Sequence, residues 1–299
     1  MAMYTSFNAR AVGRNFSARE TIEHAAAAGF GGVDLLVRDL VEAGDDPKAL
    51  RRRMDELGVR GGAWPLPVDW RGEADRFARD LERLPGLAEA ATILGLTRTG
   101  TWVLPETPER PATEAGRAAH FEATVAFHRE RLGAIARTLA GFGHRLGLEV
   151  IGVASSRSGR GMPFVTSLAD LGRVFGALWA ELPNLGILLD GFHLYAAGET
   201  IEAGLAWGVN RVVWVHVADL PASATSDRAA ILDHQRGLPG ENGTIDSRSL
   251  LRRLAKAGYD GPVTAEPMGG CASLGGLSNE ATVRNVAAAL HSVWPDDAG

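Results

Sequence analysis

Four residues with side chains suited to metal binding or acid–base chemistry each end a short apolar run in the second half of the chain. Glu149 ends LGLE, Asp190 ends ILLD, His216 ends WVH and Glu266 ends VTAE. In a parallel barrel the reactive groups lie at the carboxyl ends of the strands, so four such ends would face one mouth. Three carboxylates at that mouth would repel one another strongly unless a cation neutralised them. The pattern therefore predicts a site for one divalent metal ion.

The types of ligand limit the choice of metal but do not identify a single ion. Oxygen ligands with a single histidine suit Mn²⁺, Mg²⁺, Co²⁺ or Zn²⁺. Each carboxylate taken alone has a second explanation, as a helix N-cap or a solvated group at the rim, but four consecutive strand ends favour the metal. His193, three residues after Asp190, is expected to contact the substrate or a ligand, and packing is the alternative. Asp219 is expected to orient a neighbour or cap a loop.

The elements that must position these residues alternate along the whole chain. Short apolar runs predict strands at 3–7, 31–37, 59–64, 98–104, 145–151, 185–190, 211–217 and 262–266. Amphipathic segments predict helices near 47–57, 73–95, 117–141, 167–181, 200–207, 246–257 and 278–293, after a first helix that begins with a capping box of Ser17 and Glu20. This alternation predicts the α/β class, with a single (β/α)₈ TIM barrel domain over residues 1–299. A doubly wound open sheet is the alternative, but its GxGxxG signature is missing.

Composition limits the partners of the protein. The 299 residues are 45% hydrophobic and carry a formal net charge of −5, with no basic stripe of the kind that binds nucleic acid. The single cysteine, Cys271, excludes an internal disulfide and a cysteine-rich metal site. No apolar run approaches the roughly 20 residues that a membrane helix needs, and no signal-peptide core is present. We therefore expect a cytoplasmic protein with neither a nucleic-acid nor a membrane partner.

Several stretches resemble the xylose isomerase-like barrels, a superfamily of sugar and inosose isomerases, epimerases and dehydratases that also includes apurinic-site endonucleases. They are LE at 148–149, LDGFHLYAAG at 189–198, VHVAD at 215–219, RGLPGENGTID at 236–246 and GYDGPVTAEP at 258–267. The resemblance implies that one divalent metal is held by Glu149, Asp190, His216 and Glu266. It also implies that His193 and Arg236 contact substrate oxygens. PGENGTID is one residue longer than the commoner PGEGxID, so the resemblance does not place Glu241.

The site then predicts a class of reaction. A metal that chelates a carbonyl and its neighbouring hydroxyl stabilises an enediolate, and Glu149 and Glu266 are expected to be the acid and base. The expected enzyme is an isomerase or epimerase acting on a carbohydrate or cyclitol without a phosphate group. The alternative from the same intermediate is a dehydratase acting on a keto-polyol or keto-sugar. Two further alternatives are a non-catalytic sugar-binding barrel and an apurinic-site endonuclease. The endonuclease would need extra histidines at the ends of the second and of the third or fourth expected strands, where this sequence has none.

Three features remain open on the sequence alone. Trp64 and Trp102 end the third and fourth expected strands, where each either lines the mouth and packs on a sugar face or belongs to the core. Segment 154–164, rich in Ser, Gly and Arg, is either a surface loop, a mobile lid or a clamp for a phosphorylated substrate. Segment 220–240 either covers the site or pairs subunits in a homo-oligomer.

Overall fold

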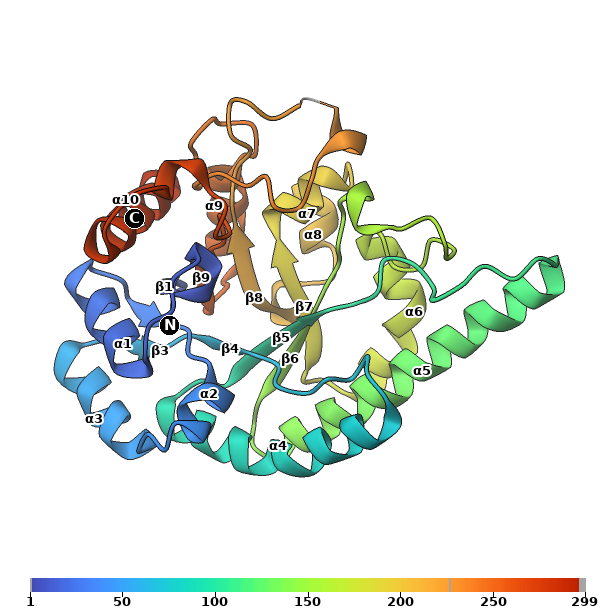
Figure 1. Ribbon diagram of the computed structural model, residues 1–299, viewed down its shortest axis with the longest axis horizontal. Helices are drawn as coiled ribbons and strands as arrows, with labels where there is room; N and C mark the ends of the chain where they lie inside the picture. Colours follow the sequence, from blue (N-terminus) through green and yellow to red (C-terminus); the bar gives the residue numbers. More distant parts are fainter. Residues whose placement is uncertain (1, 226, 296–299) are drawn as a thin grey trace.

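Short runs of aliphatic and β-branched residues form a ring of parallel strands at the centre of the molecule, and amphipathic helices surround it (Figure 1). The computed structural model describes residues 2–225 and 227–295. In chain order the strands are β1 (Tyr4–Phe7), β2 (Gly32–Val33), β3 (Arg60–Gly61), β4 (Ala63–Pro65), β5 (Arg98–Trp102), β6 (Arg145–Glu149), β7 (Leu185–Asp190), β8 (Val212–Val217) and β9 (Pro262–Ala265). The predicted α/β barrel is confirmed.

Most of the helices begin after a Ser, Thr or Asp residue whose side chain accepts a hydrogen bond from a first-turn amide; the helices that begin after Leu36 and Glu73 are exceptions, because those side chains make no such bond within the described residues. The helices are α1 (Ala18–Ala27), α2 (Val37–Glu42), α3 (Pro47–Leu57), α4 (Ala74–Leu94), α5 (Glu114–Ala140), α6 (Leu168–Glu181), α7 (Gly191–Ala196), α8 (Ile201–Leu205), α9 (Ser247–Ala257) and α10 (Asn279–Val293). The predicted capping box is present, since Ser17 Oγ accepts from the Glu20 amide at 3.2 Å and Glu20 Oε2 accepts from the Ser17 amide at 2.8 Å. None of the helices within 2–225 and 227–295 has the length and apolar character needed to cross a membrane.

The third predicted strand, 59–64, is interrupted at Gly62 and forms both β3 and β4. β3 pairs with β2, and β4 pairs with β5, so the chain itself closes the ring at this point. The strand predicted at 31–37 is also shorter than expected, because only Gly32–Val33 pairs and α2 begins at Val37. Both differences lie on the side of the barrel opposite the four predicted ligands.

A buried carboxyl group explains the interruption. Asp34 Oδ1 accepts hydrogen bonds from Ser6 Oγ at 2.6 Å and from the Ala63 amide at 2.7 Å, and Asp34 Oδ2 accepts from Thr264 Oγ1 at 2.7 Å. A Cβ atom on Gly62 would lie 2.2 Å from Asp34 Oδ1, so only glycine fits there. Burial raises the pKa of Asp34 despite these hydrogen bonds. Asp34 thus ties the segments around β1, β2, β4 and β9 together inside the barrel.

Candidate metal centre and active site

Four neighbouring strands bring the four predicted ligands together. β6, β7, β8 and β9 are adjacent in the sheet; Glu149 ends β6, Asp190 ends β7, His216 is in β8 and Glu266 follows β9. One ligand atom from each residue lies within 4.8 Å of all the others. This clustering follows from parallel pairing, in which Asp190 is the register partner of His216. Residues 117 positions apart in the chain can therefore share one cation.

The donor set fits a divalent cation, and His216 shows this most directly. Its ring is buried and packs edge-on against Trp214, with ring centroids 4.4 Å apart and planes at 82°. Nδ1 lies 3.2 Å from Glu266 Oε2 and 3.7 Å from Glu149 Oε1, yet among the residues that the structure describes neither ring nitrogen makes a well-formed hydrogen bond. Buried polar atoms without partners are rare and call for an explanation. A nitrogen left open among three carboxylates is suited to bind a metal.

The charges in the cluster are strongly coupled. Burial raises the pKa of Glu149 well above its usual value, and nearby Glu266 raises it further. Burial opposes the charged form of His216, but Glu266, Glu149 and Asp190 outweigh this and raise its pKa to about 9. Burial also acts to raise the pKa of Glu266, but His216 and Arg236 lower it below its usual range. A divalent ion bound here would therefore displace the proton of His216.

Arg236 is the second positive charge of the cluster, and each of its five N–H groups has a protein acceptor. Nη1 donates to Asp190 Oδ2 at 2.8 Å and to Glu266 Oε2 at 2.9 Å. Nη2 donates to Asp233 Oδ1 at 2.7 Å and to His193 Nε2 at 3.0 Å, and Nε donates to the Asp233 carbonyl at 3.1 Å. Arg236 thus orients two of the predicted ligands from behind.

His193, the residue predicted to contact substrate, is held in one tautomer. A guanidinium group can only donate, so Nε2 must accept from Arg236 and the proton lies on Nδ1. Burial lowers the pKa of His193, which keeps the ring neutral, and Nδ1 has no hydrogen-bond partner within residues 2–225 and 227–295. The backbone of Gly152 presses against this residue, since a Cβ there would lie 2.1 Å from the His193 carbonyl oxygen. His193 is therefore held as a neutral ring, with Nε2 facing Arg236 beside the ligands and Nδ1 buried.

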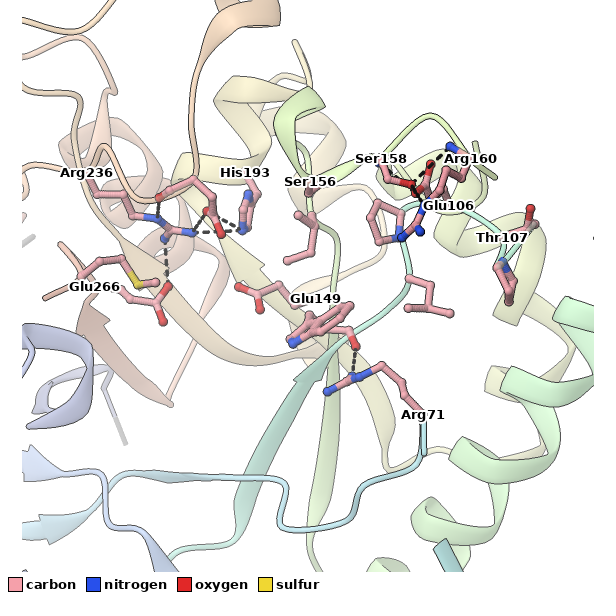
Figure 2. Close-up of a pocket in the computed structure, with 17 residues that line it drawn as sticks. Arg71, Glu106, Thr107, Glu149, Ser156, Ser158, Arg160, His193, Arg236 and Glu266 are labelled. Atoms are coloured by element: carbon pink, nitrogen blue, oxygen red, sulfur yellow. Dashed lines mark hydrogen bonds and ion pairs between the residues drawn. The ribbon is translucent and has the colours of Figure 1, made fainter. Parts of the chain in front are cut away.

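A cavity of about 660 Å³ opens over the cluster (Figure 2). Its wall includes Glu149, His193, Arg236 and Glu266, with Arg71, Trp102, Leu104, Glu106, Ile151, Ser158, Arg160, Asp233 and Met268. A second lobe of about 390 Å³ shares Arg71, Trp102, Glu149, Glu266 and Met268 with the first and reaches His216. Glu149 and Glu266 line both lobes and His216 lines the second, so the ligand cluster borders the place where the lobes meet. Each lobe is large enough for part of a small substrate.

The two tryptophans singled out in the sequence lie in different places. Trp64 is fully buried and packs edge-on against His144 at 5.7 Å between ring centroids. It belongs to the core, and we do not keep it as a candidate substrate contact. Trp102 is 39% exposed and lines both lobes of the cavity, so it remains a candidate.

Asp219 organises the loop that follows β8. Its carboxylate accepts hydrogen bonds from the amides of Leu220, Asn242, Gly243 and Ile245 at 2.6 to 3.0 Å. It is fully buried and contributes no atom to the ligand cluster. Its position agrees with the expected loop cap.

Glu241, which the resemblance left unplaced, also serves the loops. Its carboxylate accepts from the Leu238 amide at 2.7 Å and from Ser273 Oγ at 2.6 Å. It thereby joins the loop after β8 to the loop after β9, and it is not among the residues lining the cavity.

Three residues of the cavity wall were not singled out from the sequence. Asp233 lies three positions before Arg236 in LDHQRG, and that spacing was an available signal for an ion pair. Glu106 binds the amides of Ser158 and Gly159, which pins segment 154–164 against the barrel, and no local pattern indicates this contact. Arg71, in the stretch DWRGE at 69–73, looked like one of many scattered arginines.

Two comparisons place the chain among known proteins by sequence. Residues 22–290 match the family described as xylose isomerase-like TIM barrel. The chain is 27% identical over 250 residues to a 3-dehydroshikimate dehydratase from Pseudomonas aeruginosa, a match that covers 83% of this chain and 35% of that protein. It therefore spans about a third of the length of the curated relatives it matches.

Solved structures show the same barrel. A xylose isomerase domain protein from Alicyclobacillus acidocaldarius is 28% identical, with a TM-score of 0.80 and 98% of each chain covered. The IOLI protein, whose structure has a bound zinc atom, is 17% identical, with a TM-score of 0.76 and 97% of this chain and 98% of that chain covered. At this low sequence identity, the structural similarity supports a shared fold and nothing more. The family match over most of the chain shows that this protein belongs to the xylose isomerase-like TIM barrel family.

Proposed function

We propose that the protein is a divalent-metal-dependent isomerase or epimerase that moves a proton next to the carbonyl group of a sugar or cyclitol ketone. One observation carries the proposal. Four ligand atoms lie within 4.8 Å of one another, and the outer two residues, Glu149 and Glu266, are carboxylates that line both lobes of the cavity. Membership of a family of sugar isomerases and epimerases supports this class of enzyme.

Each side chain then has a distinct task. Glu149, Asp190, His216 and Glu266 would hold the ion, which supplies a Lewis acid that polarises a substrate carbonyl. Glu149 and Glu266 reach the cavity from strands at opposite flanks of the cluster, so one can remove a proton while the other returns it. His193, in the cavity wall beside Arg236, would contact the substrate. Arg236 fixes the orientation of Asp190 and Glu266.

Dehydration is the second candidate, because the relatives at 27% and 25% identity are named 3-dehydroshikimate dehydratases. Removal of a proton next to a carbonyl is the first step of both reactions. The outcomes separate afterwards, since a β-hydroxyl group either leaves or stays. The two candidates therefore use the same residues and differ in the substrate placed over them.

Hydrogen exchange with solvent tests the proposal. The protein is loaded with Mn²⁺, Co²⁺ or Zn²⁺ and incubated in D₂O with ketoses, inososes and 3-dehydroshikimate. We expect NMR to show deuterium next to the carbonyl, together with an isomer or epimer. Loss of water without such a product would instead identify the dehydratase.

Two variants test the assigned roles. Glu266→Gln and Glu149→Gln should each lower exchange by about 100-fold or more, the range of general acid–base catalysis. Metal content is measured in each variant, and the assay uses saturating metal, so that lost binding is not mistaken for lost proton transfer. Full exchange in both variants, or no exchange and no dehydration across the panel, would contradict the proposal.

A further inference from the structure

Arg71 forms no ion pair with a carboxylate in the described part of the chain, although the charge of nearby Asp69, which pairs with Arg76, favours its charged form. It lies in the loop between β4 and α4. Nη1 donates to Thr101 Oγ1 at 3.2 Å and to the Trp102 carbonyl at 2.9 Å, and both acceptors are uncharged. Within residues 2–225 and 227–295, Nε and Nη2 make no protein hydrogen bond, and no carboxylate forms an ion pair with Arg71. One edge of the guanidinium group, with three N–H donors, is therefore free.

The side chain is fixed in place by its surroundings. The guanidinium carbon lies 3.8 Å from the centroid of the Trp102 ring and 4.8 Å from that of Trp70. Trp70 is fully buried and donates from Nε1 to Thr101 Oγ1 at 3.1 Å. Cation–π contacts and the two Nη1 hydrogen bonds thus hold the group without using its free edge. Such a group binds a ligand with little loss of conformational entropy.

Arg71 lies where the two lobes of the cavity meet. It lines both lobes of the cavity together with Trp102, Glu149 and Glu266. Its acceptor Trp102 is the register partner of Glu149 in the sheet, and Figure 2 shows the Arg71 side chain extending from its loop toward Glu149. Neighbouring strands are about 4.8 Å apart. One small substrate can therefore reach both the ligand cluster and Arg71.

Arg236 and Arg71, which both line the cavity, differ in how many of their N–H groups have a protein acceptor. Every N–H group of Arg236 has a protein acceptor, and two of its partners are predicted metal ligands. Arg71 is half-buried, and burial lowers its pKa, which reflects the cost of keeping a cation away from water. Buried charges are normally paired. An anion from outside the protein would supply the missing partner.

We propose that Arg71 binds a carboxylate group of the substrate, so that the enzyme acts on carboxylated keto-polyols, such as keto sugar acids or cyclic hydroxy-keto acids, rather than on neutral sugars. The reaction in this proposal rests on the proposed function, whereas the binding of a carboxylate by Arg71 does not. The free Nε–Nη2 edge presents two parallel donors, a geometry that matches the two oxygens of a planar carboxylate. Trp102, held against Arg71, offers its exposed part to the carbon skeleton.

Matched pairs of compounds test this proposal. Each pair has a carboxylated member and a neutral one: a ketohexuronate with the parent ketohexose, and 3-dehydroshikimate with its carboxamide. Calorimetry measures binding to the metal-loaded protein, and exchange in D₂O measures kcat/KM. We expect the carboxylated member of each pair to bind more tightly. Arg71→Met should weaken its binding and lower its kcat/KM by roughly 10- to 100-fold, as expected for loss of a charged hydrogen-bonded pair.

Controls separate a binding role from a structural one. Arg71→Met should lower binding of the carboxylated member at least about 10-fold more than binding of the neutral member, and Arg71→Lys should restore part of the preference. Arg79→Met makes the same charge change on the exposed face of α4 and should keep the full preference. Equal losses for both members would show that Arg71 only supports the fold of the loop, and the proposal would fail.

Other outcomes identify a different anion or a different receptor. A stronger preference for a ketose phosphate, or a preference lost in Arg160→Met but kept in Arg71→Met, would overturn the proposal, as would failure of every carboxylated member to bind. If carboxylates bind through Arg71 and none exchanges, the proposed function fails while this inference stands. If neutral ketoses exchange and Arg71→Met has no effect, the proposed function stands alone.

Discussion

His216 shows how one residue type at one strand end determines the chemistry of the site. A buried imidazole is costly in a protein interior when neither nitrogen makes a well-formed hydrogen bond, as is the case for His216 within the described part of the chain. Here it lies among carboxylates whose combined charge raises its pKa to about 9. A bound divalent ion would remove both problems, because it takes the imidazole as a ligand and balances the carboxylates. The site is therefore expected to be more stable with metal than without.

Metal removal should be visible in the stability of the whole protein. A ligand that binds only the folded state, at a free concentration roughly 100 times its Kd, adds about 2.7 kcal/mol to the free energy of unfolding. We expect Tm to fall when a chelator removes the ion and to recover when the ion is added back. Thermal denaturation followed by circular dichroism measures both steps.

A pair of histidine variants checks the source of that shift. His216→Ala should abolish most of the metal-dependent change in Tm. His291→Ala, on the exposed face of α10, should keep it. An unchanged shift in His216→Ala would place the metal elsewhere.

At the scale of elements, the loops after β8 and β9 are held by carboxylates that do not touch the cavity. Asp219 accepts four backbone N–H groups from the loop after β8, and Glu241 connects that loop to Ser273. The same loop carries Arg236, which orients Asp190 and Glu266. The conformation of this loop therefore affects the orientation of Asp190 and Glu266 through the guanidinium group of Arg236.

Asp219→Ala should loosen this loop. Four buried or half-buried amide donors would lose their acceptor, so we expect a loss of roughly 3 kcal/mol or more in the free energy of unfolding. Hydrogen exchange should speed up first at the amides of Asn242 and Gly243. Asp227→Ala, which removes only an exposed cap from the same loop, should cost about 1 kcal/mol or less. Equal effects in the two variants would show that Asp219 has no special role.

The elements also show what the sequence could and could not predict. Strand ends and helix caps are local signals, and they located Glu149, Asp190, His216 and Glu266 on neighbouring strands. The break at Gly62 depends on Asp34, which is 28 positions away and approaches only in the folded barrel. Trp64 and Trp102 both end apolar runs, and the phase of the pleat and the path of the next loop decide which of them is buried. Arg71 differs from Arg236 in having no ion-pair partner among the described residues, and no sequence pattern indicates that a partner is missing.

Two buried histidines, His128 and His144, are expected to make the stability of the whole protein depend on pH. His128 lies within α5, and His144 follows that helix; neither is exposed. Burial lowers the pKa of each to about 4, and in the described part of the chain one ring nitrogen of each lacks a hydrogen-bond partner. Neither contributes to the ligand cluster, so both act on stability rather than on chemistry.

Stability should therefore fall in acid. Both histidines have a lower pKa in the folded state than the value of 6.5 expected when unfolded, so the unfolded chain binds more protons below pH 6.5. Their contribution is complete above pH 6.5 and is lost as pH falls toward 4, by up to about 1.4 kcal/mol per pH unit for each histidine. Denaturant unfolding at several pH values measures the slope. It should be shallower in His144→Leu and unchanged in His291→Ala, and a slope unaffected by His144→Leu would refute the assignment.

Strand β9 lies between β8 and β1 in the sheet, and Glu266 follows it directly. A chain that has folded only as far as residue 261 has two open sheet edges and an incomplete set of ligands. Pairing of β9 removes both edges and delivers the last carboxylate in the same step. Metal affinity is therefore a measure of ring closure: a partly folded intermediate that lacks this strand would hold the ion poorly, and the native protein would be the first species along the folding pathway able to retain it.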